Sequence, residues 1–293
     1  MEYFEYRNVV IEAPYSPEAE AYRKLELNIA MMSIDKKTQV IQCTSPTPED
    51  GKTTTAINLA SSLALLGKRI LLIDLDYQAN ATTCMGIHRG SFDKSVFDCL
   101  TEEAAIPDVI RLTDNPLIHV LPAKTTVEGI EEKIILNTNR DFILHTQLKL
   151  VKEDYDYILI DCPPSLGYVT TNAMVASDGV IVPVQCEFLA MDGLTQLLNT
   201  IRLVQAKKKV NMETLTIFGV LLTMLDTRTS AGFQVVNEVK TYFGEKVFQT
   251  IIPRNISCSN ATFYGVPVTE FSPKSKSSIS YQQLAKEVIS RNG

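Results

Sequence analysis

The residues with the clearest capacity for chemistry lie in residues 43–54, which read CTSPTPEDGKTT. This stretch directly follows an apolar run and directly precedes a helical pattern, which is the setting of a phosphate-binding loop. Gly51 lets the backbone turn tightly, the Lys52 ammonium can reach the β- and γ-phosphates of a nucleotide, and the Thr53 hydroxyl can ligate Mg²⁺. Thr54 and the free backbone N–H groups at the helix start would face the same phosphates.

Three aspartates follow two other apolar runs. Asp74 and Asp76 end the first run, and Asp161 ends the second. In an open parallel sheet, ligands bind at the edge formed by the carboxyl ends of the strands. Asp161 has the Walker B arrangement, in which an aspartate holds Mg²⁺, often through water. Pro46 stands in place of the first glycine of GxxxxGK[ST], so GKT alone is weak evidence, but GKT and three strand-end acids form one constellation.

The elements that must position these groups are those of an α/β fold. Short strand-like runs alternate with helical periodicity, and several runs are continuous β-branched and leucine sequences, as in strands buried on both faces. We therefore predict a mostly parallel twisted sheet with helices on both faces. Strands are predicted at residues 39–43, 69–74, 117–121, 157–161, 179–184, 216–224 and 247–252, and helices at residues 52–66, 143–152, 170–176, 191–204, 231–243 and 277–290.

The chain is long enough for one large domain with an attachment. Hydrophobic residues are 45% and charged residues 21% of its 293 residues, which excludes a disordered or collagen-like chain. We predict a P-loop domain over residues 38–293 and an N-terminal extension over residues 1–37. The extension contains one predicted helix, because Ser16 and Pro17 form a helix start. That helix either packs on the sheet or serves self-association.

Charge, cysteines and histidines narrow the class of protein. The net charge of −6 argues against a chain that coats nucleic acid over its whole surface, yet residues 207–293 carry eleven Lys and Arg against six Asp and Glu. The six cysteines form no CxxC pair and are interpreted as reduced core thiols, and the three histidines lack metal-ligand spacing. No apolar run reaches the length of a membrane span and the N-terminus is acidic, so a cytoplasmic location is expected.

With these residues in place, the chain resembles the ParA/Soj/MinD family of deviant Walker ATPases, and specifically its ParA/Soj partitioning branch. The resemblance covers roughly residues 38–291. Its motifs are GKTTT at 51–55 with NLA at 58–60, DLD at 74–76 with Gln78 and NAT at 80–82, DCPPSLG at 161–167, PVQCE at 183–187, GVLLTMLDTRT at 219–229 and IPRN at 252–255.

The resemblance implies ATP and Mg²⁺ as cofactors and a role for each matching residue. Lys52 and Thr53 bind the phosphates and Mg²⁺, Asp76 positions or activates the attacking water, and Asp74 and Asp161 support the metal. The full implied nucleotide set also contains Asp50, Gly51, Thr54 and the adenine-flanking Met224, Asp226, Pro253 and Arg254.

Partners are implied in the same way. Family members form homodimers face to face around two ATP molecules, bind DNA without sequence preference in that state, and release it after hydrolysis stimulated by a ParB-like partner. The DNA-binding candidates that match are Arg228, Lys274 and Lys276. A nucleoid-associated location in the cytoplasm follows from this reading.

One departure affects the dimer. The family loop is KGGxGKT, whose first lysine reaches the partner's phosphates, whereas residues 47–53 here read TPEDGKT. Thr47 cannot supply that positive charge. Glu49 and Asp50 also bring two acids near a polyphosphate, which weakens anion binding unless they point outward.

Two alternatives stay open, and the sequence argues against a third. The loop also resembles the PGEGK[ST] loop of bacterial tyrosine kinases, but their ExxRxxR pattern is only half present, with Glu20 and Arg23 matching and Glu26 in place of the second arginine. A nucleotide-binding switch with little turnover is favoured by Thr47. A MinD-like membrane-recruited factor would need a basic amphipathic C-terminal helix, and residues 279–289 fit a core-packing helix better, so no membrane partner is expected.

Overall fold

The computed structural model describes residues 37–45, 47, 49–125, 129–187, 191–209 and 213–292. The helix predicted after Ser16, and with it the extension up to residue 36, lies outside the described residues. The division into an extension and a P-loop domain therefore stays a prediction.

The described strands form one sheet in the order β3-β4-β2-β5-β1-β6-β7. All neighbouring strands pair in parallel except β3 and β4, which are antiparallel. This confirms the predicted mostly parallel sheet. The strands are β1 (Val40–Cys43), β2 (Ile70–Asp74), β3 (Arg111–Leu112), β4 (Ile118–Leu121), β5 (Tyr157–Asp161), β6 (Gly179–Gln185) and β7 (Thr216–Thr223).

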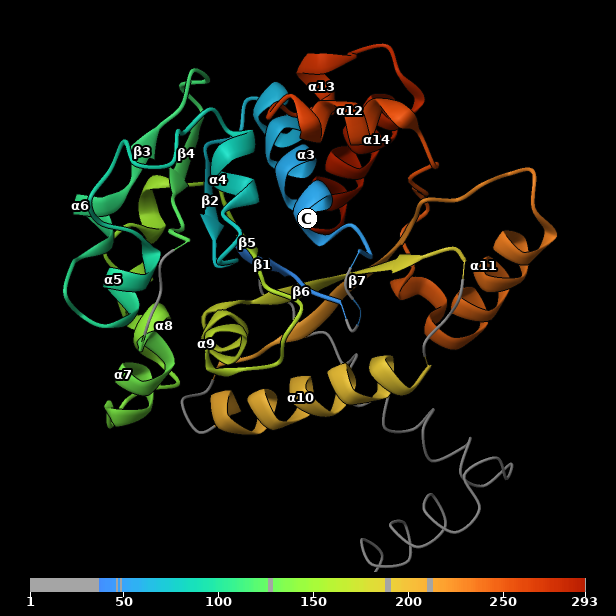
Figure 1. Ribbon diagram of the computed structural model, residues 1–293. Helices are drawn as coiled ribbons and strands as arrows, with labels where there is room; N and C mark the ends of the chain where they lie inside the picture. Colours follow the sequence, from blue (N-terminus) through green and yellow to red (C-terminus); the bar gives the residue numbers. More distant parts are fainter. Residues whose placement is uncertain are drawn as a thin grey trace, which may run out of the picture.

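Helices cover both faces of this sheet, as predicted (Figure 1). The α-helices with described residues are α3 (Lys52–Leu65), α4 (Asn80–Cys84), α5 (Val96–Leu100), α6 (Ile106–Val109), α7 (Ile130–Leu136), α8 (Ile143–Leu148), α9 (Tyr168–Ala176), α10 (Met191–Lys209), α11 (Ser230–Phe243), α12 (Ile256–Phe263), α13 (Val268–Phe271) and α14 (Lys276–Arg291). Helices α3 and α14 pack together on one face, and α9 and α10 pack together on the other.

Alternate residues of the central strands supply the two faces of the core. Leu72 joins the cluster under α3 and α14, whereas its neighbours Leu71 and Ile73 join the cluster on the opposite face. Successive side chains of a strand point to opposite sides, so a strand covered on both sides must be apolar at every position. This is why β2 and β5 read as continuous apolar runs.

No helix in the described ranges is both long and apolar enough to cross a membrane.

The strand predicted at residues 247–252 is not formed. The segment runs beside β7 and contacts it through the Phe248 and Ile252 N–H groups, which donate to Val220 and Leu222. The N–H groups between them, at residues 249 and 250, donate instead to the Glu287 carboxylate of α14 at 2.8 and 3.0 Å. A side chain of another element thus holds both N–H groups between the two bonds to β7, and no continuous ladder forms.

The other differences concern short elements. The sequence patterns did not predict β3 or the helices α4, α5, α6, α7, α12 and α13, which have four to eight residues each apart from the two-residue β3. A helix of one or two turns is too short to display a 3.6-residue periodicity. The predicted helix at 143–152 divides into α8 and a 3₁₀ turn, η1 (Lys152–Asp154), and α10 continues to Lys209 instead of ending at residue 204.

Asn58 offers a test of how α3 is attached to the C-terminal region. Its amide donates to the Thr54 carbonyl at 2.7 Å and accepts from the Val268 N–H of α13 at 2.7 Å, and its side chain is buried. We expect Asn58→Ala to lower the free energy of unfolding by about 1–3 kcal/mol, because a buried N–H loses its acceptor. Urea unfolding measures this. The control Asn237→Ala, on an exposed position of α11, should change it by less than about 0.5 kcal/mol, and an equal decrease in both variants would contradict the assignment.

Candidate nucleotide-binding site

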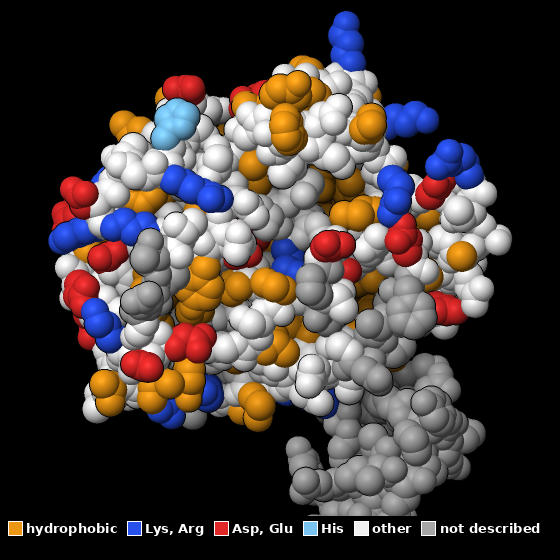
Figure 2. All heavy atoms as spheres, viewed as in Figure 1, with side chains coloured by type: hydrophobic (Ala, Val, Ile, Leu, Met, Phe, Trp, Pro, Cys, Tyr) orange, Lys and Arg blue, Asp and Glu red, His pale blue; other side chains and the backbone are white. Residues whose placement is uncertain are grey.

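The parallel pairing of three central strands brings the predicted chemical groups to one edge of the sheet. In the register, Cys43 of β1 lies opposite Asp161 of β5, and Asp161 lies opposite Asp74 of β2. The loop that follows β1 and the acids that end β2 and β5 therefore meet, as the sequence predicted. Acidic and basic side chains are seen together near the middle of the face drawn in Figure 2.

The loop turns sharply before α3 begins. Glu49 and Gly51 have positive φ angles of 66° and 87°, and the Gly51 carbonyl accepts the first helical bond, from Thr55 N–H at 2.8 Å. The end of β7 supports the loop, because the Thr223 hydroxyl donates to the Asp50 carbonyl at 3.0 Å. Gly51 is also close to Met224, whose Cε lies 3.6 Å from the position that a Cβ of residue 51 would take. The N-terminal N–H groups of α3 are thus presented at the carboxyl edge of the sheet.

Lys52 lies buried inside this loop. Its ammonium donates to Ser45 Oγ at 3.0 Å and to the Thr47 carbonyl at 2.7 Å. Burial lowers the pKa of Lys52, and the nearby carboxylates of Asp50, Asp161 and Asp76 oppose that effect. A cation that three acids surround can bind an anion only in competition with them.

Asp161 is the acid with unused hydrogen-bonding capacity. It is fully buried, and neither carboxylate oxygen accepts a hydrogen bond within the described part of the chain. Burial raises the pKa of Asp161 well above its usual range, as do Asp74 and Asp76, whereas the nearby Thr53 hydroxyl and Lys52 ammonium lower it. A buried carboxylate without partners is costly, so this position calls for a cation.

These residues fit Mg²⁺. A carboxylate and a hydroxyl are the oxygen donors that Mg²⁺ prefers, and it takes one or two carboxylates together with substrate phosphates. The described residues contain no group of three or more His, Cys, Asp or Glu that could hold a metal ion by itself. The arrangement at Thr53 and Asp161 therefore suits a metal that arrives with a phosphate ligand.

Asp74 and Asp76 have different surroundings. The buried Asp74 carboxylate accepts from Thr82 N–H and hydroxyl at 2.7 Å each and from Asp76 N–H at 3.1 Å. Burial raises the pKa of Asp74 to about 6 against the lowering effect of these bonds. Asp76 is half-buried, and one of its oxygens accepts from Gln78 N–H at 2.9 Å. Asp74 therefore holds the loop that presents Asp76.

The predicted adenine-flanking loops lie side by side. Leu225 N–H donates to Ile252 at 3.1 Å, and Arg254 N–H donates to Leu225 at 3.0 Å. Asp226 forms a two-pronged ion pair with Arg228, with nitrogen to oxygen distances of 2.9 and 2.6 Å. These two hydrogen bonds hold the pKa of the Asp226 carboxyl well below its usual range. Arg254 pairs with Glu187, which follows β6.

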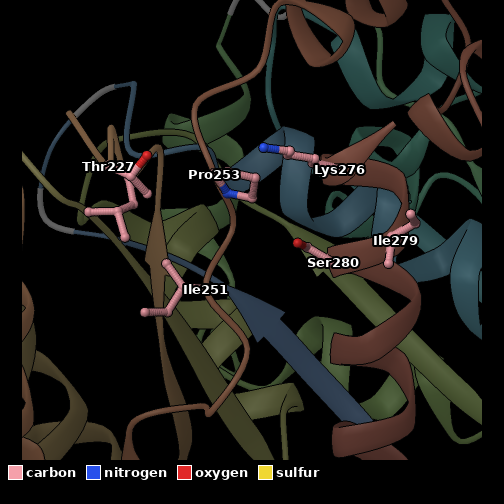
Figure 3. Close-up of a pocket in the computed structure, with 7 residues that line it drawn as sticks. Thr227, Ile251, Pro253, Lys276, Ile279 and Ser280 are labelled. Carbon is pink, nitrogen blue, oxygen red and sulfur yellow. The ribbon is translucent and has the colours of Figure 1, made fainter. Parts of the chain in front are cut away.

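A cavity of about 340 Å³ joins these loops to the basic C-terminal region. Thr227 and Pro253 line it on one side, and Lys276 and Ile279 of α14 line it on the other (Figure 3). Arg228, Lys274 and Lys276 are all exposed. The structure thus places the predicted DNA-binding residues Arg228 and Lys276 near the same cavity, beside the predicted adenine loops.

Some contact residues escaped the sequence analysis. The Ser45 hydroxyl accepts from Lys52, and the Thr223 hydroxyl donates to the loop backbone. The Thr82 hydroxyl donates to Asp74. Hydroxyl residues are common in strands and turns, so their types indicate no function before the fold brings them to the site. Thr82 and Thr223 do lie inside the family motifs, and that position was the one indication in the sequence that they could belong to the site.

Comparison with known proteins agrees with this geometry. Residues 39–214 match the family described as AAA domain. The sporulation initiation inhibitor protein Soj of Bacillus subtilis is 47% identical over 250 residues, which span 85% of this chain and 98% of that protein. The chromosome partitioning protein ParA of Caulobacter vibrioides is 44% identical over 243 residues, which span 82% of this chain and 90% of that protein.

A solved structure shares the fold and holds the predicted cofactors. Cobyrinic acid a,c-diamide synthase from Mycobacterium smegmatis, with bound ATP analogue and magnesium, superposes with a TM-score of 0.74 at 31% identity, covering 85% of this chain and 93% of that one. The chain belongs to the ParA/Soj family of P-loop ATPases. The predicted class of enzyme and its predicted cofactors, ATP and Mg²⁺, are confirmed at this level.

Lys52 should dominate nucleotide affinity. We expect Lys52→Ala to weaken Mg-ATP binding by roughly 10- to 100-fold or more, because it removes a charge-assisted hydrogen bond and leaves Asp50, Asp161 and Asp76 without a cation. Isothermal titration calorimetry measures this. The control Lys68→Ala removes a lysine beyond the opposite end of α3 and should leave affinity unchanged. Wild-type affinity in Lys52→Ala would remove the phosphate-loop assignment.

Proposed function

We propose that the chain is a ParA-type ATPase that acts in DNA partitioning. The observation that carries the proposal is the buried Asp161 carboxylate, whose oxygens accept no hydrogen bond of normal geometry from the described residues and which lies near the Thr53 hydroxyl and the Lys52 ammonium. The extent of its similarity to partitioning proteins supports the biological role. This function would place the chain in the cytoplasm, in association with the nucleoid.

The residues of the site divide the work of phosphoryl transfer. Lys52 and the N–H groups of Gly51, Thr53 and Thr54 bind the phosphates. Thr53 and Asp161 would hold Mg²⁺, with Asp74 supporting the metal, and the bound ion would supply positive charge to the phosphate oxygens. Met224, Asp226, Pro253 and Arg254 flank the base.

Asp76 acts on the attacking water, and Asp74 positions Asp76. The Asp74 carboxylate fixes the Asp76 backbone N–H and, through Thr82, the start of α4. Asp76 has one oxygen that accepts from Gln78, and the other accepts no hydrogen bond from the described residues. That oxygen is available to orient the attacking water or to accept its proton.

Asp76 should matter for turnover and not for binding. We expect Asp76→Ala to slow ATP hydrolysis by about 10²- to 10⁴-fold, the usual effect of removing a water-positioning or general-base group. Phosphate release measures turnover, and calorimetry should show Mg-ATP affinity within about threefold of wild type. The control Asp93→Ala removes an exposed acid elsewhere. Wild-type turnover in Asp76→Ala, together with abolished turnover in Asp161→Ala, would move this role to another residue.

DNA binding without sequence preference is the second part of the proposal. Arg228, Lys274 and Lys276 are exposed, and Thr227 and Lys276 share a cavity with Pro253. A change in the base-flanking loops on nucleotide binding would therefore reach the basic side chains directly. Asp226 supports such coupling, because it belongs to the base-flanking set and also neutralises Arg228.

The dimer and the partner complete the proposal. The ATP-bound chain forms a homodimer, and a ParB-like protein stimulates hydrolysis and release from DNA. With Thr47 in place of the cross-dimer lysine, each γ-phosphate lacks a charge-assisted hydrogen bond normally worth about 1.5–3 kcal/mol. Other interactions must therefore stabilise the dimer. ATP turnover with and without DNA and the ParB-like protein tests the whole scheme, and turnover that responds to neither would contradict it.

The proposed DNA surface has a direct test. We expect binding to need ATP and to weaken steeply with salt, because it arises from counterion release. The plot of log affinity against log salt has a negative slope. Changing Arg228, Lys274 and Lys276 together to Ala should make this slope less steep, by roughly one for each side chain that binds a phosphate in the wild type. Fluorescence anisotropy with two unrelated duplexes measures this. A matched control changes the exposed Lys94, Lys133 and Lys149, and equal binding by wild type and the first triple variant would place the surface elsewhere.

A further inference from the structure

The phosphate loop contains an acid that binds the loop itself. The Asp50 Oδ2 atom accepts from the Thr47 N–H at 3.2 Å and also accepts from the Thr47 hydroxyl. The Thr47 carbonyl accepts from the Ser45 hydroxyl at 2.9 Å and from the Lys52 ammonium at 2.7 Å. All the polar groups of Thr47 therefore have partners within the loop, before any phosphate is bound.

The two neighbouring acids of the loop are not equivalent. Asp50 is 6% exposed and its backbone carbonyl is held by Thr223, whereas Glu49 is exposed. Asp50 also exerts the largest charge effect on Lys52. Water screens an exposed charge strongly and a buried one weakly, so Asp50 acts on a bound phosphate far more than Glu49 does.

We propose that Asp50 is a positioning residue that holds the loop closed through Thr47 and that its charge opposes the β- and γ-phosphates of a bound nucleotide. The proposal rests on the proposed function as an ATPase. The Asp50 carboxylate fixes the position of Thr47 by two hydrogen bonds, in a loop where the family has a lysine at this position. The consequence is a preformed loop with lowered affinity for ATP and ADP.

The geometric and electrostatic effects can be separated by substitution. Asp50→Asn keeps an oxygen that accepts from Thr47 but removes the charge, whereas Asp50→Ala removes both. We expect Asp50→Asn to bind Mg-ATP at least about threefold more tightly than wild type. Asp50→Ala should bind at least about threefold more weakly than Asp50→Asn, because its loop is not held. Calorimetry with Mg-ATP on the full-length chain measures both.

Two controls distinguish this role from a general effect on folding or net charge. Glu49→Gln makes the same change of charge one residue away and should shift affinity less than about twofold. AMP lacks the β- and γ-phosphates, so its affinity should be equal in wild type and Asp50→Asn. A gain in AMP binding of the same size, or an equal gain in Glu49→Gln, would overturn the proposal.

A double-mutant cycle tests the hydrogen bond between the two side chains. Thr47→Val removes the hydroxyl and nearly preserves the shape of the side chain. It should weaken Mg-ATP binding in the wild-type background by about two- to fivefold and have no effect in the Asp50→Ala background. Equal effects in both backgrounds would show that the hydroxyl acts independently of Asp50, and would overturn the positioning role.

The failure of this inference differs from failure of the proposed function. If wild type and Asp50→Asn both fail to bind Mg-ATP, the nucleotide-binding function itself is wrong, and Asp50 loses its role with it. If wild type binds Mg-ATP and Asp50→Asn binds it equally or more weakly, only the role of Asp50 is overturned. Urea unfolding of each variant confirms that the compared proteins are folded.

Discussion

The parallel register of β2 against β5 places Asp74 directly beside Asp161, and both side chains are fully buried. Two neighbouring carboxylates in a dry environment are tolerated only when each is compensated. Thr82 and the Asp76 backbone provide the compensation for Asp74. Among the described residues, no donor of normal hydrogen-bond geometry compensates Asp161, and this imbalance is the basis for the proposed position of a cation and its phosphate ligand. The remainder of the site is arranged around that position.

The loop after β1 carries the opposing charge. Lys52 is buried among acids and held by Ser45 and Thr47, so the loop keeps its shape through internal hydrogen bonds. This chain has Thr47 where the family has a lysine. The positive charge of Lys52 is therefore closely balanced by the negative charges of the acids around it. Nucleotide affinity therefore depends on how each acid is oriented, and the buried Asp50 matters more than the exposed Glu49.

Helix α14 connects this site to the C-terminal region. At its end, Arg291 donates to the carbonyls of Phe218, Lys246 and Val247 and lies over the Phe248 ring, 4.1 Å from its centre. Glu287 takes the N–H groups of the segment that leads to Pro253. The same helix begins at Lys276, beside the cavity. The same helix therefore contacts the proposed base-flanking loop and carries part of the proposed basic surface, which supports the proposed link between nucleotide and DNA.

The sequence by itself determined the fold class, the central strands and the meeting of GKT with Asp74, Asp76 and Asp161, because buried parallel strands are continuous apolar runs whose carboxyl ends share one edge. It did not predict the short helices or the fate of residues 247–252, since that segment gives two N–H groups to Glu287, almost forty residues away along the chain. Sequence also left open whether the loop acids point outward. Only the tertiary structure showed that Asp50 is buried, with its carbonyl held by Thr223, and that the Asp161 oxygens accept no hydrogen bond of normal geometry from the described residues, because burial and these partners depend on elements that are distant in the chain.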